Sequence, residues 1–337
     1  MRNSSSNIIP YFLKLNDSLQ KDEIAFINDF YLKNGTEKML QFAEKNKIIP
    51  FVADKCVFLD LDSLLWKEKQ LYFFNRNTKI KRIIERMFKS LSNNDFLIYE
   101  NFGSLLLSGI NIALFSSGDI DIYCPNESVF KRLENILLEN GLIKEDRRKV
   151  GNLINSYKYF DGDLEFYFNL ERMVVAKRYN YTEKCVSERV SRYLLQKDSK
   201  IDSFEMLLYL NCLHISMGHY YSVDPSYRLY FDIEILINEV KTFDNLFNWA
   251  KEDGTFNRVY AVLYIYSQLF SVNLKLDFLQ NSSIKKIVSI VLDKNLNLNK
   301  SLSNFKKIRI DCLSDSLPLI KYLFFRLLHV RRKVNYE

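Results

Sequence analysis

Hydrophobic residues recur every three or four positions along most of the chain outside its middle. In the N-terminal part this spacing runs through DEIAFINDFYLKNG, which closes on Gly35, through TEKMLQFAEKNKIIP, which Pro50 ends, and through a long stretch that starts at Leu64. Such spacing places the apolar side chains on one side of an α-helix. We therefore expect residues 1–90 to form an N-terminal helical region.

The same period returns in the C-terminal half. It is found in MLLYLNCLHISMGH, in RLYFDIEILINEV and in NRVYAVLYIYSQLF, and the chain ends in a basic amphipathic segment, LPLIKYLFFRLLHVRRK. Chain breakers are scarce, with 9 Gly and 5 Pro in 337 residues, which favours long helices over a sandwich of short strands. Residues 177–337 are predicted to form a C-terminal helical domain.

Between these regions the hydrophobic period changes to that of strands. FLIYEN is a short apolar run, DIDIYC alternates polar and aliphatic residues, and NSYKYF and DLEFYFNL are typical of two strands joined at Asp161-Gly162. One helix lies among them, with Asn126 as its cap and Gly141 at its end. The pattern predicts the α+β class: a small mixed β-sheet core over residues 91–176, flanked by the two helical regions.

Composition and charge narrow the class of protein. Hydrophobic residues make up 47% and charged residues 26%, the balance of a folded chain. The net charge of +7 suits a partner with phosphates, although no block of basic residues interleaved with stacking aromatic ones marks a nucleic-acid site. Five scattered cysteines without a CxxC pair argue for reduced thiols and against a zinc site. With neither a signal-peptide pattern nor 18 consecutive apolar residues, we expect a soluble cytoplasmic protein without a membrane span.

Two acidic residues stand two positions apart in the predicted strand GDIDIY. Alternate residues of a strand point to the same face, so Asp119 and Asp121 present neighbouring carboxylates. Such a pair repels unless a cation lies between its members, and oxygen ligands suit Mg²⁺. Glu165 can add a third carboxylate from a neighbouring strand, and Gly103-Ser104 lead into a helix whose free amides can hold a phosphate. Together these residues predict a site for metal-assisted phosphoryl transfer.

This succession of Gly-Ser, helix and Asp-x-Asp strand resembles the signature of the polymerase-β-like nucleotidyltransferase superfamily. More narrowly, the chain resembles a family of uncharacterised bacterial nucleotidyltransferases often found in biosynthetic gene clusters. The resemblance covers about residues 20 to 240, through FAEKNKIIPFV, GDIDIY, DLEFYFNL and a Leu-rich helical segment that ends in His. It implies a nucleotidyltransferase core that moves a nucleoside monophosphate from an NTP to an acceptor.

The resemblance also implies roles at the metal site. Asp119 and Asp121 would bind the metals, while Glu165 would complete the site and act as the general base. We expect Mg²⁺ at a two-metal site, with Mn²⁺ as an alternative, and ATP is the first NTP to consider. The acceptor is expected to be a hydroxyl of a small molecule, a sugar or a peptide.

Phosphate contacts follow from the same resemblance. Gly103 and Ser104 would hold the triphosphate, Ser117 is a further candidate, and Gly118 lets the backbone approach a ligand. The chain departs from the family's pattern at two cations. Phe102 stands where a Lys usually precedes the glycine, and Phe115-Ser116-Ser117 stand where an Arg usually precedes GDID.

The C-terminal helical region offers residues for an acceptor pocket. His214, Arg228 and Asp232 are the candidates, although His214 stands in an apolar run and also suits a hydrogen-bonded packing role. Two alternatives stay open. The net charge and the basic tail suggest an enzyme of the same chemistry that acts on RNA or tRNA, as a toxin would. The missing cations suggest a catalytically degenerate binding protein with the same fold.

Overall fold

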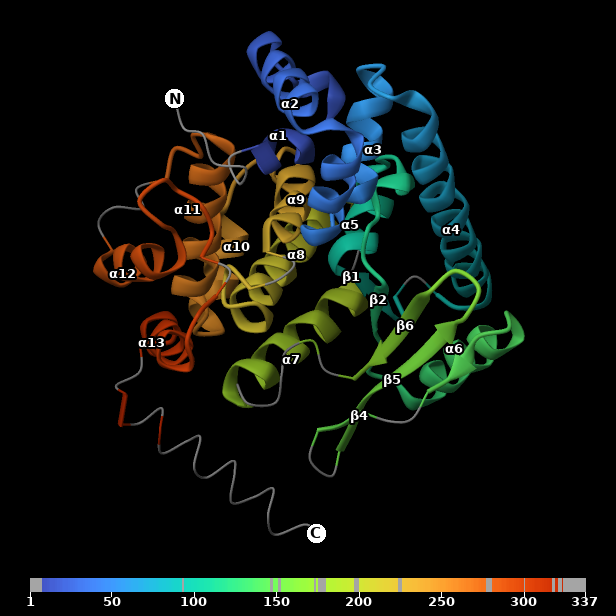
Figure 1. Ribbon diagram of the computed structural model, residues 1–337. Coiled ribbons are helices and arrows are strands. Elements are labelled where there is room, and N and C mark those ends of the chain that lie inside the picture. Colours follow the sequence, from blue (N-terminus) through green and yellow to red (C-terminus); the bar gives the residue numbers. More distant parts are fainter. Residues whose placement is uncertain are drawn as a thin grey trace.

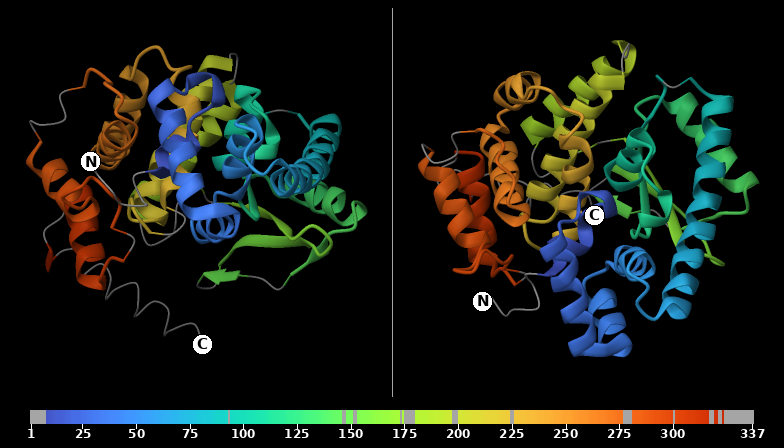
Figure 2. Two further views of the ribbon diagram at one scale, coloured as in Figure 1. Left: turned by 45° about the horizontal axis from the view of Figure 1, so that its top comes forward. Right: turned by 90° about the horizontal axis from the view of Figure 1, so that it is seen from above.

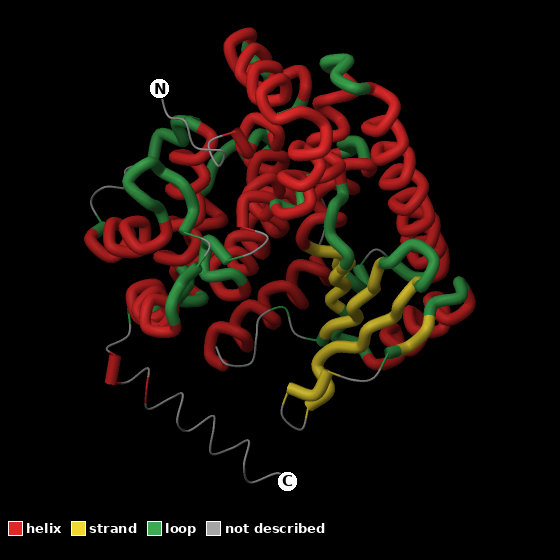
Figure 3. The backbone as a smooth tube through the Cα atoms, viewed as in Figure 1, coloured by secondary structure: helices red, strands yellow, loops and turns green. Residues whose placement is uncertain are grey.

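The computed structural model describes most of the chain between residues 8 and 323 (Figure 1). Helices dominate, and a single mixed sheet forms in the middle of the chain, so the predicted α+β class is confirmed. The strands lie together at one side of the molecule, with helices around them (Figure 3). The basic segment predicted from Leu317 onward lies almost entirely outside the described residues. The described ranges are 8–92, 94–145, 148–150, 153–172, 174, 180–196, 200–223, 226–276, 281–299, 301–316, 319–320 and 323.

The N-terminal part is helical, as predicted. Helix α2 (Lys21–Lys45) is interrupted at Gly35, whose φ of +70° and ψ of 169° are not helical, so two helical segments meet at a kink there and the break that the pattern placed at Gly35 is confirmed. Pro50 opens a helix rather than ending one, since it occupies the first turn of α3, where its missing N–H leaves no bond unmade. The elements are α1 (Ile9–Leu13), a 3₁₀ turn (Asn16–Ser18), α2 (Lys21–Lys45), α3 (Ile49–Phe58) and α4 (Ser63–Ser90).

The sheet has the strand order β1-β2-β6-β5-β3, and β4 also pairs with β5. Strands β2 and β6 run parallel, and the other pairs are antiparallel. The strands are β1 (Leu97–Tyr99), β2 (Asp119–Tyr123), β3 (Ile143–Lys144), β4 (Arg148–Val150), β5 (Leu153–Asp161) and β6 (Phe166–Glu171). Between β1 and β2 lie α5 (Glu100–Ser108) and a 3₁₀ turn (Ile112–Leu114), and between β2 and β3 lies α6 (Glu127–Glu139).

Glu165 corrects one sequence expectation. The pattern placed it inside a strand, but β6 begins only at Phe166, and Glu165 lies in the preceding turn with a φ of +52°. The reason is local, because Oδ1 of Asp161 accepts the backbone N–H of Leu164 at 3.1 Å and closes a turn of four residues. Glu165 is consequently exposed at the end of the β5–β6 hairpin.

Helix α6 covers the apolar face of the sheet. Asn126 caps it as predicted, its side chain accepting from the amides of Ser128 and Val129. The Phe130 ring of α6 packs edge-on against Tyr157 of β5, with 5.1 Å between the ring centres. Since successive strand residues alternate between faces, the acidic residues of β2 point to the opposite face of the sheet.

The C-terminal helices pack beside the N-terminal ones, and buried charges join some of them. Arg258 is fully buried and pairs with Asp311 and Asp315, which fastens α13 to α11. In both views of Figure 2 the last helices, α12 and α13, lie on one side of the molecule and the sheet lies on the other. Among the described helices, none is long and apolar enough to cross a membrane. The elements are α7 (Asn180–Gln196), α8 (Lys200–Leu213), a π-helical turn (His214–Gly218), α9 (Ser226–Ile237), α10 (Asp244–Glu252), α11 (Phe256–Phe270), α12 (Ser282–Val291) and α13 (Asn304–Ser314).

Candidate active site

Four strands align polar side chains across the face of the sheet that α6 leaves uncovered. Tyr99 of β1 and Asn169 of β6 flank Asp121 of β2, and Lys158 of β5 lies next to Asn169. Paired residues of neighbouring strands point to the same face, so these four side chains form one row. Asp119 lies on the same face, two residues earlier in β2. The register thus surrounds the two predicted carboxylates with polar groups from three other strands.

Asp119 forms an ion pair with a lysine of β5. The Nζ of Lys158 lies 3.1 Å from Oδ1 of Asp119 and 4.8 Å from the ring centre of Tyr167. The side chain of Asp119 is 45% exposed and that of Lys158 is 13% exposed, so the carboxylate is the more accessible partner of the pair. The sequence pattern did not indicate Lys158, because its role depends on the register of β5 against β6.

Among the described residues, the carboxyl group of Asp121 has more hydrogen-bond partners than that of Asp119. Nδ2 of Asn169 donates to its Oδ1 at 2.7 Å, and its carboxyl group is hydrogen-bonded to that of Glu100. Loss of contact with water and the adjacent Glu100 raise the pKa of Asp121 well above its usual range, against the effect of the Asn169 bond. Both carboxyl groups of this contact thus hold a proton more strongly than they would in water.

Glu100 connects the carboxylates of β2 with His214 of the π-helical turn. It stands at the junction of β1 and α5 with a φ of +59°, a conformation that is costly for a buried non-glycine residue. Its Oε1 lies 2.5 Å from Nδ1 of His214. Burial raises the pKa of Glu100 to about 8, and loss of water contact lowers that of His214 to about 4, so the pair is uncharged at neutral pH. Sequence reasoning missed Glu100, although an acid directly before the Gly-Ser helix was a signal for it.

The three candidate acceptor residues gather around this glutamate. His214 contacts it directly, and the charges of Arg228 and Asp232 both act on it. Arg228 donates to Oδ1 of Asn101, the residue after Glu100. Burial raises the pKa of Asp232 to about 8, while Arg228 opposes the shift. The structure therefore joins residues from α9 and the π-helical turn to the acidic residues of β2.

Gly103 and Ser104 are part of the packing of α5. A Cβ at Gly103 would lie 2.3 Å from the carbonyl oxygen of Ile98, so the glycine permits the close approach of α5 to β1. Ser104 has no exposed surface, and its hydroxyl donates to the carbonyl of Glu100 and accepts from Nδ2 of Asn211 on α8. A contact between Ser104 and a triphosphate would require these two bonds to break.

Ser117 and Gly118 lead into β2 and are fixed from below by an arginine. Arg76 of α4 is buried and donates to the carbonyls of Ser117 and Leu164, which join the entries of β2 and β6. Oγ of Ser117 accepts the amide of Asp119 at 3.3 Å, and the carbonyl of Gly118 accepts the amide of Tyr167. Both residues thus orient the strand that presents Asp119.

Glu165 lies apart from this cluster. It is exposed, and its charge acts on Arg76 and Tyr167 rather than on Asp121. Within the described part of the chain, no hydrogen bond or ion pair joins Glu165 to either aspartate of β2. Its role as third metal ligand stays a prediction, and Glu100 is the acid that the structure places beside Asp121.

Comparison with known protein families matches residues 33–271, more than two thirds of the chain, to a family described as "Uncharacterised nucleotidyltransferase". The chain belongs to this family. Membership confirms the resemblance seen in the sequence, and it gives the protein nucleotidyl transfer as its general function and a nucleotide as its substrate. Neither the curated proteins nor the solved structures contain a match to the chain.

Nucleotidyl transfer of this kind implies a metal ion, so the question is whether the side chains of the site could coordinate one. As the side chains stand, no three His, Cys, Asp or Glu residues of the described ranges converge to hold an ion. Within the described part of the chain, Oδ1 of Asn169 is buried and has no hydrogen-bond partner, and the Nδ2 of the same amide group donates to Asp121. A cluster of carboxylates and one unpaired amide oxygen has the chemistry that Mg²⁺ prefers, so these residues fit the metal.

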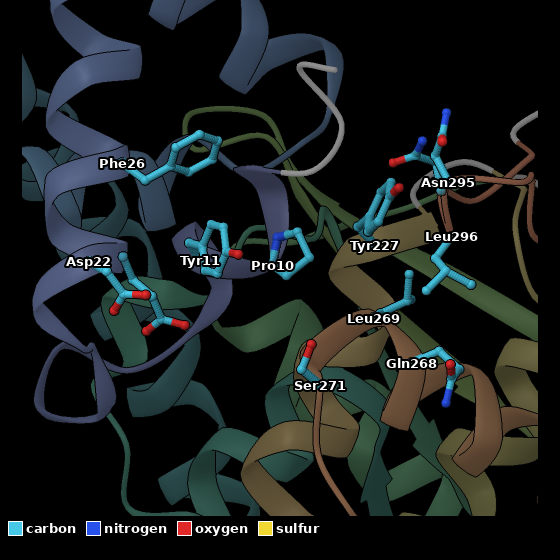
Figure 4. A pocket seen from close by; sticks show the side chains of 12 residues that line it. Pro10, Tyr11, Asp22, Phe26, Tyr227, Gln268, Leu269, Ser271, Asn295 and Leu296 are labelled. Carbon is cyan, nitrogen blue, oxygen red and sulfur yellow. The ribbon is translucent and has the colours of Figure 1, made fainter. Parts of the chain in front are cut away.

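The protein also has a cavity of about 470 Å³ away from this site. It lies between the N-terminal helices, α9 and the end of α11, and Figure 4 shows Tyr11, Phe26 and Tyr227 around it. None of the candidate site residues lines it. The cavity is thus separate from the carboxylates that define the nucleotidyltransferase site.

Proposed function

We propose that the protein transfers a nucleoside monophosphate from an NTP to a hydroxyl group of a small molecule, a sugar or a peptide. The acceptor hydroxyl gives up its proton to a general base and its oxygen forms a bond to the α-phosphorus, while the bond from that phosphorus to the bridging oxygen breaks and pyrophosphate leaves with the electron pair. The observation that supports this reaction most strongly is the pair Asp119 and Asp121 on one face of β2, in a chain of the nucleotidyltransferase family.

Two Mg²⁺ ions, or Mn²⁺ in their place, would supply activation of the acceptor hydroxyl and neutralisation of the leaving group. Asp119 and Asp121 would hold them. The chain's own contribution is rigidity, because β2 is a central strand and Arg76 fixes its entry through the carbonyl of Ser117. Ligands on a central strand keep their spacing better than ligands on a loop.

Lys158 supplies a positive charge in place of the family's missing Lys and Arg. The family's usual Lys and Arg are absent at Phe102 and at Phe115–Ser117, but the ammonium of Lys158 lies directly at Asp119. We assign Lys158 to the phosphates of the NTP, where a lysine acts as a compact point charge. This assignment favours a working enzyme over a degenerate one.

The acceptor would lie between the strand carboxylates and α9. His214, Arg228 and Asp232 line the side of the cluster that faces the C-terminal helices, and all three act on Glu100. Imidazole, guanidinium and carboxyl groups together can hydrogen-bond a polyhydroxylated or peptide-like acceptor. A buried polar wall of this kind discriminates against acceptors that leave its groups unpaired.

The test is calorimetric binding of ATP with and without Mg²⁺, together with pyrophosphate release. The Asp119→Asn/Asp121→Asn variant should lose metal-dependent binding, and Lys158→Gln should weaken it. Asp163→Asn, an acid in the exposed β5–β6 turn, is the matched control and should bind as the wild type does. Equal ATP binding by the wild type and the double variant, or none in either, would refute the proposal and point to a degenerate binding protein.

A second candidate acceptor is RNA, because one helix concentrates the positive charge of the chain. Helix α4 contains eight Lys or Arg and two Glu, a net charge of +6 out of +7 for the whole protein. Tyr72 and Phe74 are exposed on the same helix. Cations that bind phosphates and aromatic rings that stack on bases are the means by which proteins bind single-stranded RNA.

Binding of labelled tRNA at two salt concentrations tests this candidate. Charge reversal of two exposed residues, Lys81→Glu/Arg82→Glu, should weaken binding by about tenfold or more and reduce its salt dependence. Lys241→Glu, an exposed lysine outside α4, is the control. If the wild type shows no salt-sensitive binding of tRNA, RNA is excluded as the acceptor, and a small molecule, a sugar or a peptide stays the proposed one.

A further inference from the structure

We infer that Glu100, rather than Glu165, supplies the third carboxylate of the metal site. This inference rests on the proposed function and specifies one of its ligands. It departs from the expectation that the third acid comes from the strand after the β5–β6 turn, and places it at the junction of β1 and α5.

The first support is the meeting of three oxygen-bearing side chains from three segments. The carboxyl groups of Asp121 on β2 and Glu100 are hydrogen-bonded to each other, and Asn169 of β6 donates its Nδ2 to Asp121 at 2.7 Å. These contacts come from the register of the sheet and from the start of α5, and neither depends on a flexible loop. The three side chains are therefore already close together before any ligand binds.

The second support is the amide oxygen of Asn169, which is an observation independent of the carboxyl groups. Asn169 is only 7% exposed, and its Oδ1 has no hydrogen-bond partner within the described part of the chain. A buried amide oxygen without a partner is rare, because it loses its bond to water and gains none from the protein. An Mg²⁺ ion coordinated by this oxygen, Asp121 and Glu100 would satisfy it and would remove the repulsion between the two carboxylates.

The third support is the backbone. Glu100 adopts a φ of +59° although it is a buried acid, and such positions recur where the surrounding fold fixes a residue for function. The surroundings do fix it, because the hydroxyl of Ser104 bonds to its carbonyl and is itself held by Asn211 of α8. Its carboxyl group contacts Nδ1 of His214 at 2.5 Å. Carboxylates that bind metal are typically hydrogen-bonded from behind in this way.

Of these features Glu165 shares only the positive φ, here +52°. It lies in an exposed turn, and among the described residues no hydrogen bond or ion pair joins it to Asp119, Asp121 or Asn169. Glu171 is a nearer alternative, since it lies on the same face of the sheet, but its carboxyl group accepts the hydroxyl of Tyr99. Glu100 is thus the acid with both the contact to Asp121 and the unpaired oxygen beside it.

The experiment measures Mn²⁺ binding to the full chain by electron paramagnetic resonance, with calorimetry of Mg²⁺ as a second readout. Glu100→Gln should weaken Mn²⁺ binding by about tenfold or more, in line with the loss of a ligand. Glu165→Gln and Glu171→Gln are matched controls and should stay within about twofold of the wild type. Glu100→Asp keeps the charge but shortens the side chain, so its affinity for Mn²⁺ should lie between those of the wild type and Glu100→Gln. This variant replaces Glu100→Gln in the test if the Gln variant does not fold.

The outcomes distinguish a failure of this inference from a failure of the proposed function. Wild-type affinity in Glu100→Gln with a loss in Glu165→Gln or Glu171→Gln overturns this inference and leaves the proposed function standing, provided that Asp121→Asn also loses the ion. Binding that is equal in all the glutamate variants overturns it as well. Absence of Mn²⁺ binding in the wild type overturns both the inference and the proposed function.

Discussion

Replacing Glu100 by Gln should change how the stability of the metal-free protein depends on pH. The glutamate is buried in the candidate active site, and its proton is held by the folded state more strongly than by the unfolded chain. Gln has nearly the same shape and can still hydrogen-bond, but it cannot ionise. The charged or titratable groups that face Glu100 are Asp119 and Asp121 of β2, Glu171 of β6, His214 of the π-helical turn, and Arg228 and Asp232 of α9.

The size of the effect follows from the pKa. Burial raises the pKa of Glu100 from 4.5 to about 8 in the folded state. A raised pKa means that the bound proton stabilises the fold fully below pH 4.5, and that this stabilisation is lost as the pH rises through 8. At 1.36 kcal/mol per pKa unit the loss is about 5 kcal/mol, a large share of the stability of an ordinary domain. Removing Glu100 also removes a charge that raises the pKa of Asp121. At high pH the Glu100→Gln variant should therefore be more stable than the wild type for both reasons.

Urea unfolding followed by circular dichroism in EDTA measures the free energy of unfolding from about pH 5 to about pH 9. The wild type should lose stability across this range, Glu100→Gln should lose several kcal/mol less, and the two curves should cross. Glu165→Gln, which alters an exposed acid, is the control and should run parallel to the wild type. Parallel curves for the wild type and Glu100→Gln would refute the argument, because Glu100 would then ionise in the folded state as it does in water.

Three further substitutions test the packing at two glycines and the burial of one lysine, Lys55 of α3. Gly103→Ala should lower the free energy of unfolding in urea by at least about 2 kcal/mol, because its Cβ would meet the carbonyl of Ile98 at 2.3 Å. Gly118→Ala should change stability by less than about 0.5 kcal/mol, since nothing lies closer than 4.0 Å to its Cβ, and a selective loss of ATP affinity would then support a ligand role for Gly118. Burial lowers the pKa of Lys55 from 10.5 to about 8, so the wild type should gain about 3 kcal/mol as the pH rises from 8 to 10.5. Lys55→Met should not show this gain, and the difference between the two unfolding curves at those pH values measures it.

Local rules predicted most of the secondary structure. The three- and four-residue period predicted helices on both sides of the core, Asn126 capped α6, and the strand of Asp119 and Asp121 formed where alternation predicted it. The errors occurred where a turn contact or the position of a proline outweighed the hydrophobic period. The Asp161 side chain closed a turn that removed Glu165 from its strand, and Pro50 opened α3 instead of ending the preceding helix.

The sequence by itself determined the fold class, the family and the shared face of Asp119 and Asp121, because these depend on periodicity and on motifs of adjacent residues. Tertiary structure alone decided what surrounds them. Lys158 reaches Asp119 through the register of β5, β6 and β2, and Glu100 meets Asp121 and His214 because α5 packs between β1 and α8. Such contacts join residues that are far apart in the chain, and their energies depend on burial, which no local pattern of residue types specifies.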